Sequence, residues 1–460
     1  MESLGVYVLT FNCARNVIQP EAFAPHIFDA LKAASSISPA RTKAPEILAV
    51  ALQEVAPIAY AFLGGSYLDP YYDALQRAVD LGASALVSDH RAQDAQYQHM
   101  LTKNIGMTAL MVFARRDIVE RIRYIQTAGV GVGVQEAGNK GAVGARIGYL
   151  VERDGRNQRD EEDDDGGVME VTLVSAHLAP DESQWERRNE DWKNIAERLV
   201  FEPRQAPETV ADATLSREDE EGVPLLGDTS SPPLKNSSAF YSPRSYLFVA
   251  GDFNYRTADG RPTPDDFKNF PRPTGDTANN ISQFADLLAR DQLTRERQAG
   301  KTFTNFEESK ITFAPSYKYS DEARGLASSD RNGHWKWAEN RWPSWCDRIL
   351  YLNHPSAGAS DGIDVHGYTS LPLLSTSDHR PVALSASIPL RVLPESSTYL
   401  PPFEIDPDWD SRRAAARRKE VIVGAAAYLG LTWAGNGLLA ATVLGGTAAY
   451  YALQAYYVAS

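Results

Sequence analysis

Cysteine is almost absent from this chain, which has two cysteines among its 460 residues. Such a low content excludes a disulfide framework and a zinc site made of thiolates, and it fits a reducing compartment. Basic residues are outnumbered, 46 against 60 acidic ones, so the formal net charge is −14. That balance argues against a protein that coats nucleic acid. A content of 43% hydrophobic and 23% charged residues is ordinary for a globular protein, and it excludes wholesale disorder, collagen-like and coiled-coil architectures.

The negative charge is concentrated in two segments. Residues 152–165 hold eight acidic and three basic side chains, and residues 202–235 again hold eight and three. Neither segment has a helical or strand period, so we interpret both as solvated inserts, with boundaries at 152–167 and 202–244. Each has a net charge of −5, so together they carry 10 of the 14 excess negative charges. The rest of the chain is close to neutral and need not repel an anionic substrate.

Charge is missing altogether from the last 40 residues, Val421 to Ser460. A membrane core about 30 Å thick needs about 20 helical residues, so this segment is long enough to cross once, or to enter and return. Basic side chains just before it favour the cytosolic side for the preceding chain. We therefore expect one folded domain at 1–390, a Pro-containing and then basic linker at 391–420, and a hydrophobic tail anchor at 421–460.

Three arrangements of this tail remain open. A single membrane helix is the first. Gly435-Asn436-Gly437, near the middle of the tail, favours the second, a helical hairpin that re-enters the cytosolic side. The third is a buried hairpin, rich in Ala and Gly, within a soluble protein.

The remainder of the chain alternates short apolar runs with breakers. Met1 to Gly5 lacks a basic region, so the run after it is predicted to be a buried strand and not a signal sequence. Between Asp181 and Phe201 the period becomes helical. Many short strands with intervening helices predict an α/β fold, a four-layer α-β-β-α sandwich of two sheets flanked by helices. Strands are expected at 6–11, 47–53, 108–114, 141–147, 171–175, 246–250, 348–351 and 381–388.

Polar residues stand where six of these strands begin or end. Each has an ordinary structural explanation when taken singly, because Asn and Asp commonly cap and turn chains. Polar groups from several strand ends can, however, converge on one cleft. The residues concerned are Asn12, Glu54, His177, Asp252 with Asn254, Asp347, and Asp378 with His379.

The residue types at these strand ends suggest a particular chemistry. Carboxylate and amide oxygens without thiolates select a hard cation such as Mg²⁺. Two histidines and further carboxylates then remain for acid–base work and phosphate contact. Hydrolysis of a phosphate ester needs this combination, because it requires charge neutralisation, an oriented water and donors to the phosphate oxygens.

Seven motifs, in order along residues 6–388, resemble those of the inositol polyphosphate 5-phosphatases. That family belongs to the wider endonuclease/exonuclease/phosphatase fold, which is DNase I-like. The motifs are Thr10-Phe11-Asn12, Leu52-Gln53-Glu54-Val55, Gly138-Asn139-Lys140-Gly141, Ser175-Ala176-His177-Leu178-Ala179, Gly251-Asp252-Phe253-Asn254-Tyr255-Arg256, Trp345-Cys346-Asp347-Arg348-Ile349-Leu350 and Ser377-Asp378-His379-Arg380-Pro381-Val382.

The resemblance implies a role for each of the strand-end residues. Glu54 would be the principal Mg²⁺ ligand, with Asn12 beside it and Asp378 completing the metal or water network. Asp252 would orient and deprotonate the attacking water, without a covalent phosphoenzyme. The remaining roles concern the phosphate: Asn254 and His177 would hold its oxygens, and His379 would contact it while Asp347 fixes the imidazole.

Substrate recognition is likewise implied by the resemblance. Tyr317 and Lys318 would recognise the neighbouring 4-phosphate, assisted by Arg341. The family's lysine two positions before that arginine is Glu339 here, a departure that would either weaken 4-phosphate binding or leave the carboxylate facing solvent.

Two further pairs of residues belong to matching motifs. Asn139 and Lys140 would lie near the 1-phosphate side of inositol. For Arg187 and Arg188, surface salt bridging on a helix and support of the site are equally open.

Together these features predict a membrane-tethered, Mg²⁺-dependent 5-phosphatase of phosphatidylinositol 4,5-bisphosphate with a cytosolic catalytic domain. By analogy with tail-anchored fungal members of the family, we expect it at the endoplasmic reticulum. No nucleic acid and no obligate protein partner is expected. The alternatives are a 5-phosphatase of other phosphoinositides or soluble inositol phosphates, a nuclease of the same fold, and an inactive phosphoinositide-binding scaffold.

Overall fold

The structure of the protein is a computed structural model. It describes residues 3–35, 43–88, 95–151, 167–201, 239–272, 281–327, 336–353, 362–393 and 401–459. The two acidic inserts expected from the sequence lie outside these described residues, except for Gly167 and 239–244.

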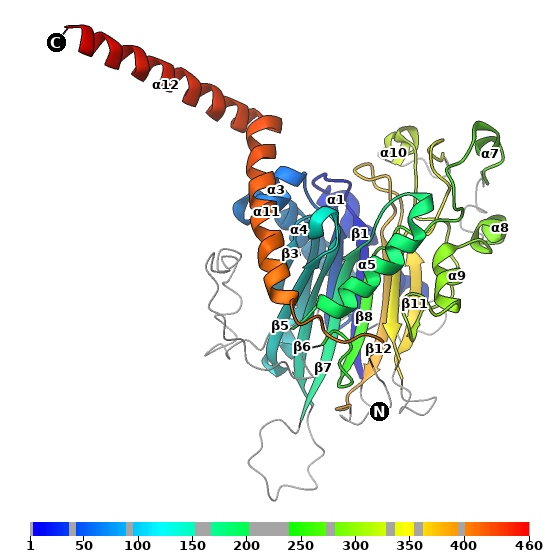
Figure 1. Ribbon diagram of the computed structural model, residues 1–460. Helices are drawn as coiled ribbons and strands as arrows, with labels where there is room; N and C mark the ends of the chain where they lie inside the picture. Colours follow the sequence, from blue (N-terminus) through cyan, green and yellow to red (C-terminus); the bar gives the residue numbers. More distant parts are fainter. Residues whose placement is uncertain are drawn as a thin grey trace, which may run out of the picture.

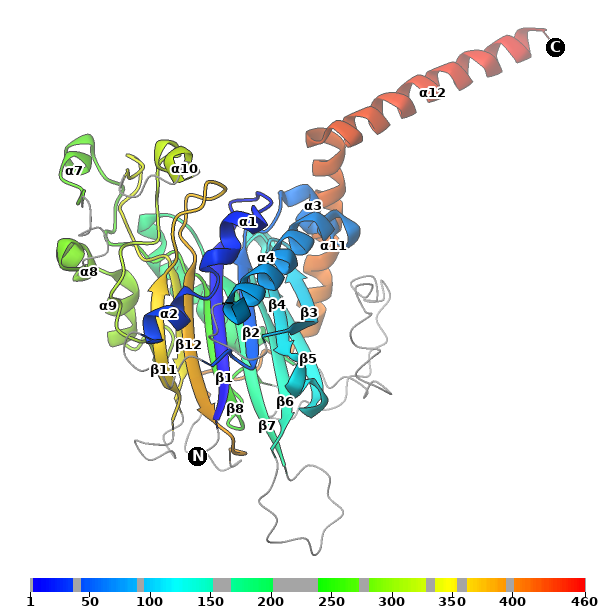
Figure 2. The same cartoon turned by 180° about the vertical axis from the view of Figure 1, so that it is seen from behind.

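Two mixed β-sheets of six strands each form the centre of the molecule (Figures 1 and 2). The strand order of the first sheet is β11 (Asp364–Ser370), β12 (Val382–Pro389), β1 (Ser3–Asn12), β2 (Ile47–Gln53), β4 (Thr108–Arg115) and β3 (Tyr97–Ile105). That of the second is β5 (Ile122–Gly131), β6 (Gly141–Leu150), β7 (Val168–His177), β8 (Ser245–Asp252), β10 (Asp347–Leu352) and β9 (Phe306–Glu307).

The central strands are apolar on both faces, which is why they read as continuous hydrophobic runs. In β1, Leu4, Val6 and Val8 belong to the core between the two sheets, whereas Tyr7 and Leu9 belong to the core under the helices of the first sheet. This alternation follows from the two-residue period of a strand. The pairs β1–β2 and β7–β8 are parallel, so polar residues that follow these strands emerge at the same end of each sheet.

Helices cover the outer face of each sheet and complete the predicted four layers. The first sheet is covered by α1 (Pro20–Phe23), α2 (Asp29–Ser35) and α4 (Asp69–Ser88), and the second by α5 (Trp185–Arg198). Trp192 of α5 stacks on Phe303, with ring centroids 3.9 Å apart. Shorter helices stand in the loops: α3 (Ile58–Leu63), α7 (Pro264–Lys268), α8 (Ala285–Leu288), α9 (Gln292–Gln298) and α10 (Asp321–Ala327). The expected α-β-β-α sandwich is confirmed.

The C-terminal region differs from the sequence-based expectation in two respects. The basic stretch expected to be a linker is helical, because α11 runs from Trp409 to Leu431 across the expected boundary at 420. The chain then bends at Thr432, and α12 (Trp433–Ala459) continues as one helix through Gly435-Asn436-Gly437, so the expected turn of a hairpin is not found there. Among the described residues, α12 is the one helix long and apolar enough to cross a membrane.

Arg348, from the Trp-Cys-Asp-Arg-Ile-Leu motif, serves the fold and not the site. Its guanidinium is buried and donates to Glu308 Oε1 at 2.6 Å and to Asp291 at 3.1 Å. Asp291 in turn accepts from Thr294 N at 2.9 Å and so caps α9. Arg348 therefore links β10 to α9 through a buried cluster of ion pairs, in which the positive and negative charges compensate each other.

Replacing Arg348 with Met should lower the free energy of unfolding by about 3–5 kcal/mol, because the two carboxylates would stay buried without their partner. Denaturant unfolding would measure this loss of stability. Arg77→Met is the matched control, since the Arg77–Glu21 ion pair is exposed on both sides and should contribute less than about 1 kcal/mol. Equal losses in the two variants would contradict this account.

Candidate active site

The polar strand ends meet at one end of the sandwich because of the strand registers. In the second sheet, His177 of β7 is paired with Asp252 of β8, and Asp347 of β10 is paired with the same Asp252 from the other side. In the first sheet, Asn12 of β1 is paired with Gln53, which places Glu54 next to it. In Figures 1 and 2 this end lies at the top, where β1 leads into α1.

A cavity of about 290 Å³ opens at this end of the sandwich. Ten of the residues that line it are charged or are histidine, and six of these ten are cationic at neutral pH by residue type. The lining residues are Asn12, Ala14, Arg15, Asn16, Glu54, Lys140, Pro180, Asp252, Asn254, Arg256, Tyr317, Lys318, Arg324, Arg341, Asp378 and His379.

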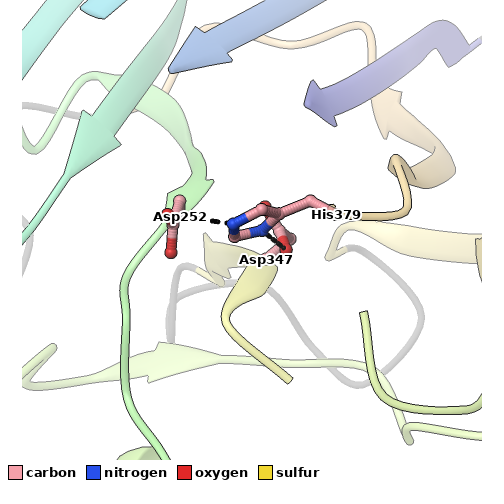
Figure 3. Close-up of side chains that lie close together, drawn as sticks. All are labelled: Asp252, Asp347 and His379. Carbon is pink, nitrogen blue, oxygen red and sulfur yellow. Dashed lines mark hydrogen bonds and ion pairs between the residues drawn. The ribbon is translucent and has the colours of Figure 1, made fainter. Parts of the chain in front are cut away.

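His379 and Asp347 form a hydrogen-bonded pair at the floor of the cavity (Figure 3). Nδ1 of His379 lies 2.8 Å from Asp347 Oδ2, which also accepts from Ser316 Oγ at 2.7 Å. Burial alone would lower the pKa of His379, but the charge and hydrogen bond of Asp347 outweigh it and raise the pKa to about 9. The ring is therefore a cation at neutral pH, as the pairing with a carboxylate predicts.

Asp252 is a buried carboxylate held by partners from both sheets. Its Oδ2 accepts from Asn12 Nδ2 at 2.9 Å, and it lies 3.3 Å from His177 Nε2 and 4.0 Å from His379 Nε2. Burial raises the pKa of Asp252, but the hydrogen bond with His177 and the charge of His379 more than compensate and hold the pKa below its ordinary value. Asp252 thus remains an anion beside a cationic ring.

His177 lies beneath Asp252 and does not line the cavity, although the resemblance assigned it a phosphate oxygen. Its ring contacts the ammonium of Lys140 and is fully buried. Burial and the charge of Lys140 lower the pKa of His177. In this geometry His177 positions Asp252 and Lys140, and Lys140 itself reaches the cavity.

Glu54 stands at the rim of the cavity in a strained backbone conformation. Its φ is 46°, a left-handed value that a residue with a side chain adopts at a cost of about 1–3 kcal/mol. Its carboxylate lies 3.3 Å from Arg15 Nε and 3.9 Å from Lys140 Nζ. Glu54, Asn12 and Asp378 all line the cavity and offer only oxygen ligands, so this donor set fits a hard divalent cation.

A second group of possible metal ligands consists of Asp252, Asp347 and His379, whose ligand atoms lie within 4.8 Å of one another. In this structure His379 Nδ1 is bonded to Asp347, and His379 Nε2 lies 4.0 Å from Asp252 Oδ2. The three side chains are therefore arranged as ion pairs around the imidazole ring.

The residues predicted to recognise the 4-phosphate all line the cavity: Tyr317, Lys318 and Arg341. The Tyr317 ring packs on His379 at 4.4 Å between centroids, and Lys318 Nζ lies 3.4 Å from Asp378. Arg341 is fixed by Asp181 at 2.5 Å and by the buried Glu182 at 2.8 Å.

Two of the residues considered for substrate recognition do not line the cavity. Asn139 is one: its side-chain oxygen packs against the backbone of Gly133. Glu339 is exposed and is also absent from the lining, which fits the interpretation that it faces solvent.

Sequence reasoning missed Arg256, which belongs to a recognised motif but had no assigned role. Its guanidinium lies 4.3 Å from the centre of the Tyr317 ring and also bonds Asn254. Arg188, left open between surface and support, is buried and donates to the carbonyls of Ala179 and Asp181. Its neighbour Arg187 instead pairs with Asp191 one helical turn away. Arg188 therefore holds the loop that carries Asp181, a partner of Arg341.

One protein family matches most of this chain. Residues 9–385 match the model of Endonuclease/Exonuclease/phosphatase family 2. The chain belongs to this family. The matched residues include every strand-end residue described above.

Two named proteins are similar to part of this chain. It is 28% identical to human phosphatidylinositol 3,4,5-trisphosphate 5-phosphatase 1 over 59% of this chain and 18% of the human protein. It is also 28% identical to type I inositol polyphosphate 5-phosphatase 13 of Arabidopsis thaliana, over 73% of this chain and 27% of that protein. The chain thus spans less than a third of the length of these relatives.

Among solved structures, the inositol polyphosphate 5-phosphatase domain of SPsynaptojanin, crystallised with inositol (1,4)-bisphosphate and a calcium ion, is similar to the chain. The TM-score is 0.54 at 20% identity, covering 92% of this chain and 93% of that one. This likeness confirms the DNase I-like fold.

Proposed function

We propose that this protein is a Mg²⁺-dependent phosphoinositide 5-phosphatase that converts phosphatidylinositol 4,5-bisphosphate to phosphatidylinositol 4-phosphate. The observation that carries the proposal is the Asp252 anion 4.0 Å from the protonated His379, at the floor of a cavity lined by cations. The curated relatives, named as 5-phosphatases of phosphoinositides and inositol phosphates, support the substrate class.

In this proposal, Asp252 orients and deprotonates the attacking water. Its lowered pKa makes it a weak base, so its main contribution is orientation. The water loses a proton as its bond to phosphorus forms and the bond from phosphorus to the inositol 5-oxygen breaks; inorganic phosphate departs, and the inositol oxygen takes up a proton and leaves as the 5-hydroxyl. His379 presents a fixed positive charge to the phosphate, and Asp347 prevents the ring from turning. Mg²⁺ bound by Glu54 with Asn12 and Asp378 would neutralise part of the phosphate charge. Neither cysteine serves as a nucleophile in this scheme, because both are buried and burial raises the pKa of each thiol.

Recognition of the 4-phosphate is proposed for Lys318 and Arg341, beside Tyr317. Each cation is held by a carboxylate, Lys318 by Asp378 and Arg341 by Glu182, so its position is set before substrate binds. Such preorganisation lowers the entropy lost on binding. Arg256, between Tyr317 and Asn254, adds a further cation on the same side.

A membrane tether is proposed for residues 433–457. Within this span a stretch of 18 residues has a mean hydropathy of 1.2, and none of that stretch is buried against the rest of the structure. In both views α12 leaves the molecule at the end of the sandwich that carries the site (Figures 1 and 2). We propose a cytosolic catalytic domain and, given the modest hydropathy and many alanines and glycines of the tail, the endoplasmic reticulum as the membrane.

The substrate can be tested directly with the full chain in detergent. Vesicles containing phosphatidylinositol 4,5-bisphosphate should release phosphate with Mg²⁺ and not with EDTA. Soluble inositol 1,4,5-trisphosphate and an abasic DNA duplex test the alternative substrates. Release from the soluble phosphate alone, or cleavage of the duplex, would overturn the proposed lipid substrate.

Asp252→Asn should lower kcat far more than tenfold, a barrier change well above about 1.4 kcal/mol, because the anion that orients water is lost. Lipid binding by the cavity should be retained, measured as KM with the lipid dispersed in detergent micelles, since the phosphate-binding cations remain. Asp73→Asn, on the exposed surface of α4, is the matched control and should leave kcat unchanged. A kcat for Asp252→Asn above about a tenth of wild type would refute this role for Asp252.

The tether can be tested by placing charge in the middle of α12. The double variant Val443→Lys, Leu444→Lys should move the protein from the carbonate-resistant membrane pellet to the supernatant, because each central lysine costs about 2.5–3.5 kcal/mol on insertion. Both side chains are exposed in the structure, so the catalytic domain should be unaffected. The matched control replaces both residues with Ala, which should leave the protein in the pellet; a charged variant that still pellets would refute the tether.

A further inference from the structure

Helix α11 is packed onto the catalytic domain along its length and is not an extended tether. The buried face of the helix carries Trp409, Ala416, Glu420 and Gly424. At Gly424 the two backbones approach so closely that an added Cβ would lie 2.9 Å from the side chain of Phe62. Figure 1 shows α11, in orange, running beside α3 toward the end of the sandwich that carries the site.

Glu420 is one of the residues through which α11 reaches the active-site loop, together with Arg412, which pairs with Glu136. The side chain of Glu420 is 4% exposed, and its Oε1 accepts a 2.6 Å hydrogen bond from the backbone N–H of Gly138. Gly138 opens the Gly138-Asn139-Lys140 motif in the loop between β5 and β6. A carboxylate of the C-terminal helix thus holds a peptide group two residues away from Lys140.

The contact continues through backbone hydrogen bonds to the other side of the cavity. The carbonyl of Gly138 accepts from Met107 N at 2.9 Å, and the carbonyl of Met107 accepts from Val55 N at 3.2 Å. Val55 directly follows Glu54, the strained residue at the rim. From Glu420, this series of hydrogen bonds therefore reaches Val55, next to Glu54. Along the loop itself, Gly138 is two residues from Lys140. The side chains of Glu54 and Lys140 lie 3.9 Å apart.

The loop needs such an external support because its own sequence is permissive. Residues 131–141 include four glycines, at 131, 133, 138 and 141, and none of the bulky aromatic residues that could pack the loop in place. Glycine leaves the backbone many alternative conformations. At Gly138 even a methyl group would lie 2.9 Å from the backbone of Gly106, so no side chain can be added there. Contacts with neighbouring segments therefore add to the backbone hydrogen bonds within the loop, such as that from Val132 N to the carbonyl of Lys140.

We propose that Glu420 is a positioning residue for the reaction and that α11 is therefore part of the active-site structure. By fixing the peptide of Gly138, it sets the positions of Lys140 and Glu54 toward the phosphate. The inference rests on the proposed phosphatase function for its kinetic consequence, whereas its effect on the loop is independent of that function.

The test uses the full chain in detergent micelles that also carry phosphatidylinositol 4,5-bisphosphate, the substrate proposed above, so insertion into a bilayer does not enter the measurement. Glu420→Ala should lower kcat by about tenfold or more, because displacing a catalytic group by about 1 Å can cost 100-fold. Glu420→Asp, one methylene shorter, should lower kcat in the same direction. Glu420→Gln should stay within about threefold of wild type, because its amide oxygen still accepts from Gly138 N.

Glu170→Ala is the matched control for the loss of a buried carboxylate. Glu170 accepts from Tyr124 near the start of β7, at the end of the sandwich away from the site. This variant should lower the melting temperature without changing kcat. If Glu420→Ala lowers the melting temperature and likewise leaves kcat within twofold of wild type, Glu420 is merely structural and the proposal is overturned.

Amide hydrogen exchange separates a failure of this inference from a failure of the proposed function. In Glu420→Ala the amides of residues 133–140, Met107 and Val55 should exchange at least about tenfold faster, while those of α5 should not change. Unchanged exchange in the loop overturns the proposal even if the enzyme is active. Faster exchange with an inactive wild-type protein would support the structural coupling and refute only the phosphatase activity.

Discussion

The arrangement at the active site depends on keeping one carboxylate ionised where water hardly reaches it. Asp252 is 1% exposed, and an unpaired charge at such a depth would cost several kcal/mol. Its stabilising partners come from different parts of the chain: Asn12 from the first sheet, His177 from the neighbouring strand of the second, and His379 from the segment before β12. The same contacts that keep Asp252 charged therefore join the two sheets at the end where the substrate is proposed to bind.

This constraint also explains why the charge of the whole chain says little about the site. The net charge is −14, yet six cations by residue type line the cavity: Arg15, Lys140, Arg256, Lys318, Arg324 and Arg341. Arg341 is fixed by Glu182, which does not line the cavity, whereas Lys318 is held by Asp378, which does. A cationic cavity concentrates an anionic ligand locally, whatever the net charge of the whole chain.

The sequence was sufficient to predict the central strands, because both of their faces are buried and they are apolar throughout. It failed for β3, β5, β9 and β11, which are the four outermost strands of the two sheets. Edge strands pair on one side only and carry polar residues, as the partly exposed β11 shows, so their periodicity is weak.

The same distinction applies to the site. Residues at strand ends, such as Asp252 and Asp347, could be found because a polar residue interrupts an apolar run. Residues that act by holding others could not, because Ser316 and Glu182 are unremarkable in sequence and become visible only through their partners. Whether a side chain lines the cavity, as Lys140 does, or lies behind it, as His177 does, depends on rotamer and packing and not on the motif.

Glu420 shows most clearly what could not be predicted from the sequence. It is the only acidic residue between Ser411 and Ser460, within a basic stretch that composition alone assigns to a linker. A linker would let the catalytic domain stand at a variable distance from the membrane, because a flexible chain has many end-to-end lengths. A helix fastened by Gly424 against Phe62 and by Arg417 to the carbonyl of Phe62 has no such freedom. Since α12 continues from that helix with one residue between them, the end of the sandwich that carries the cavity is held next to the membrane that α12 is proposed to enter.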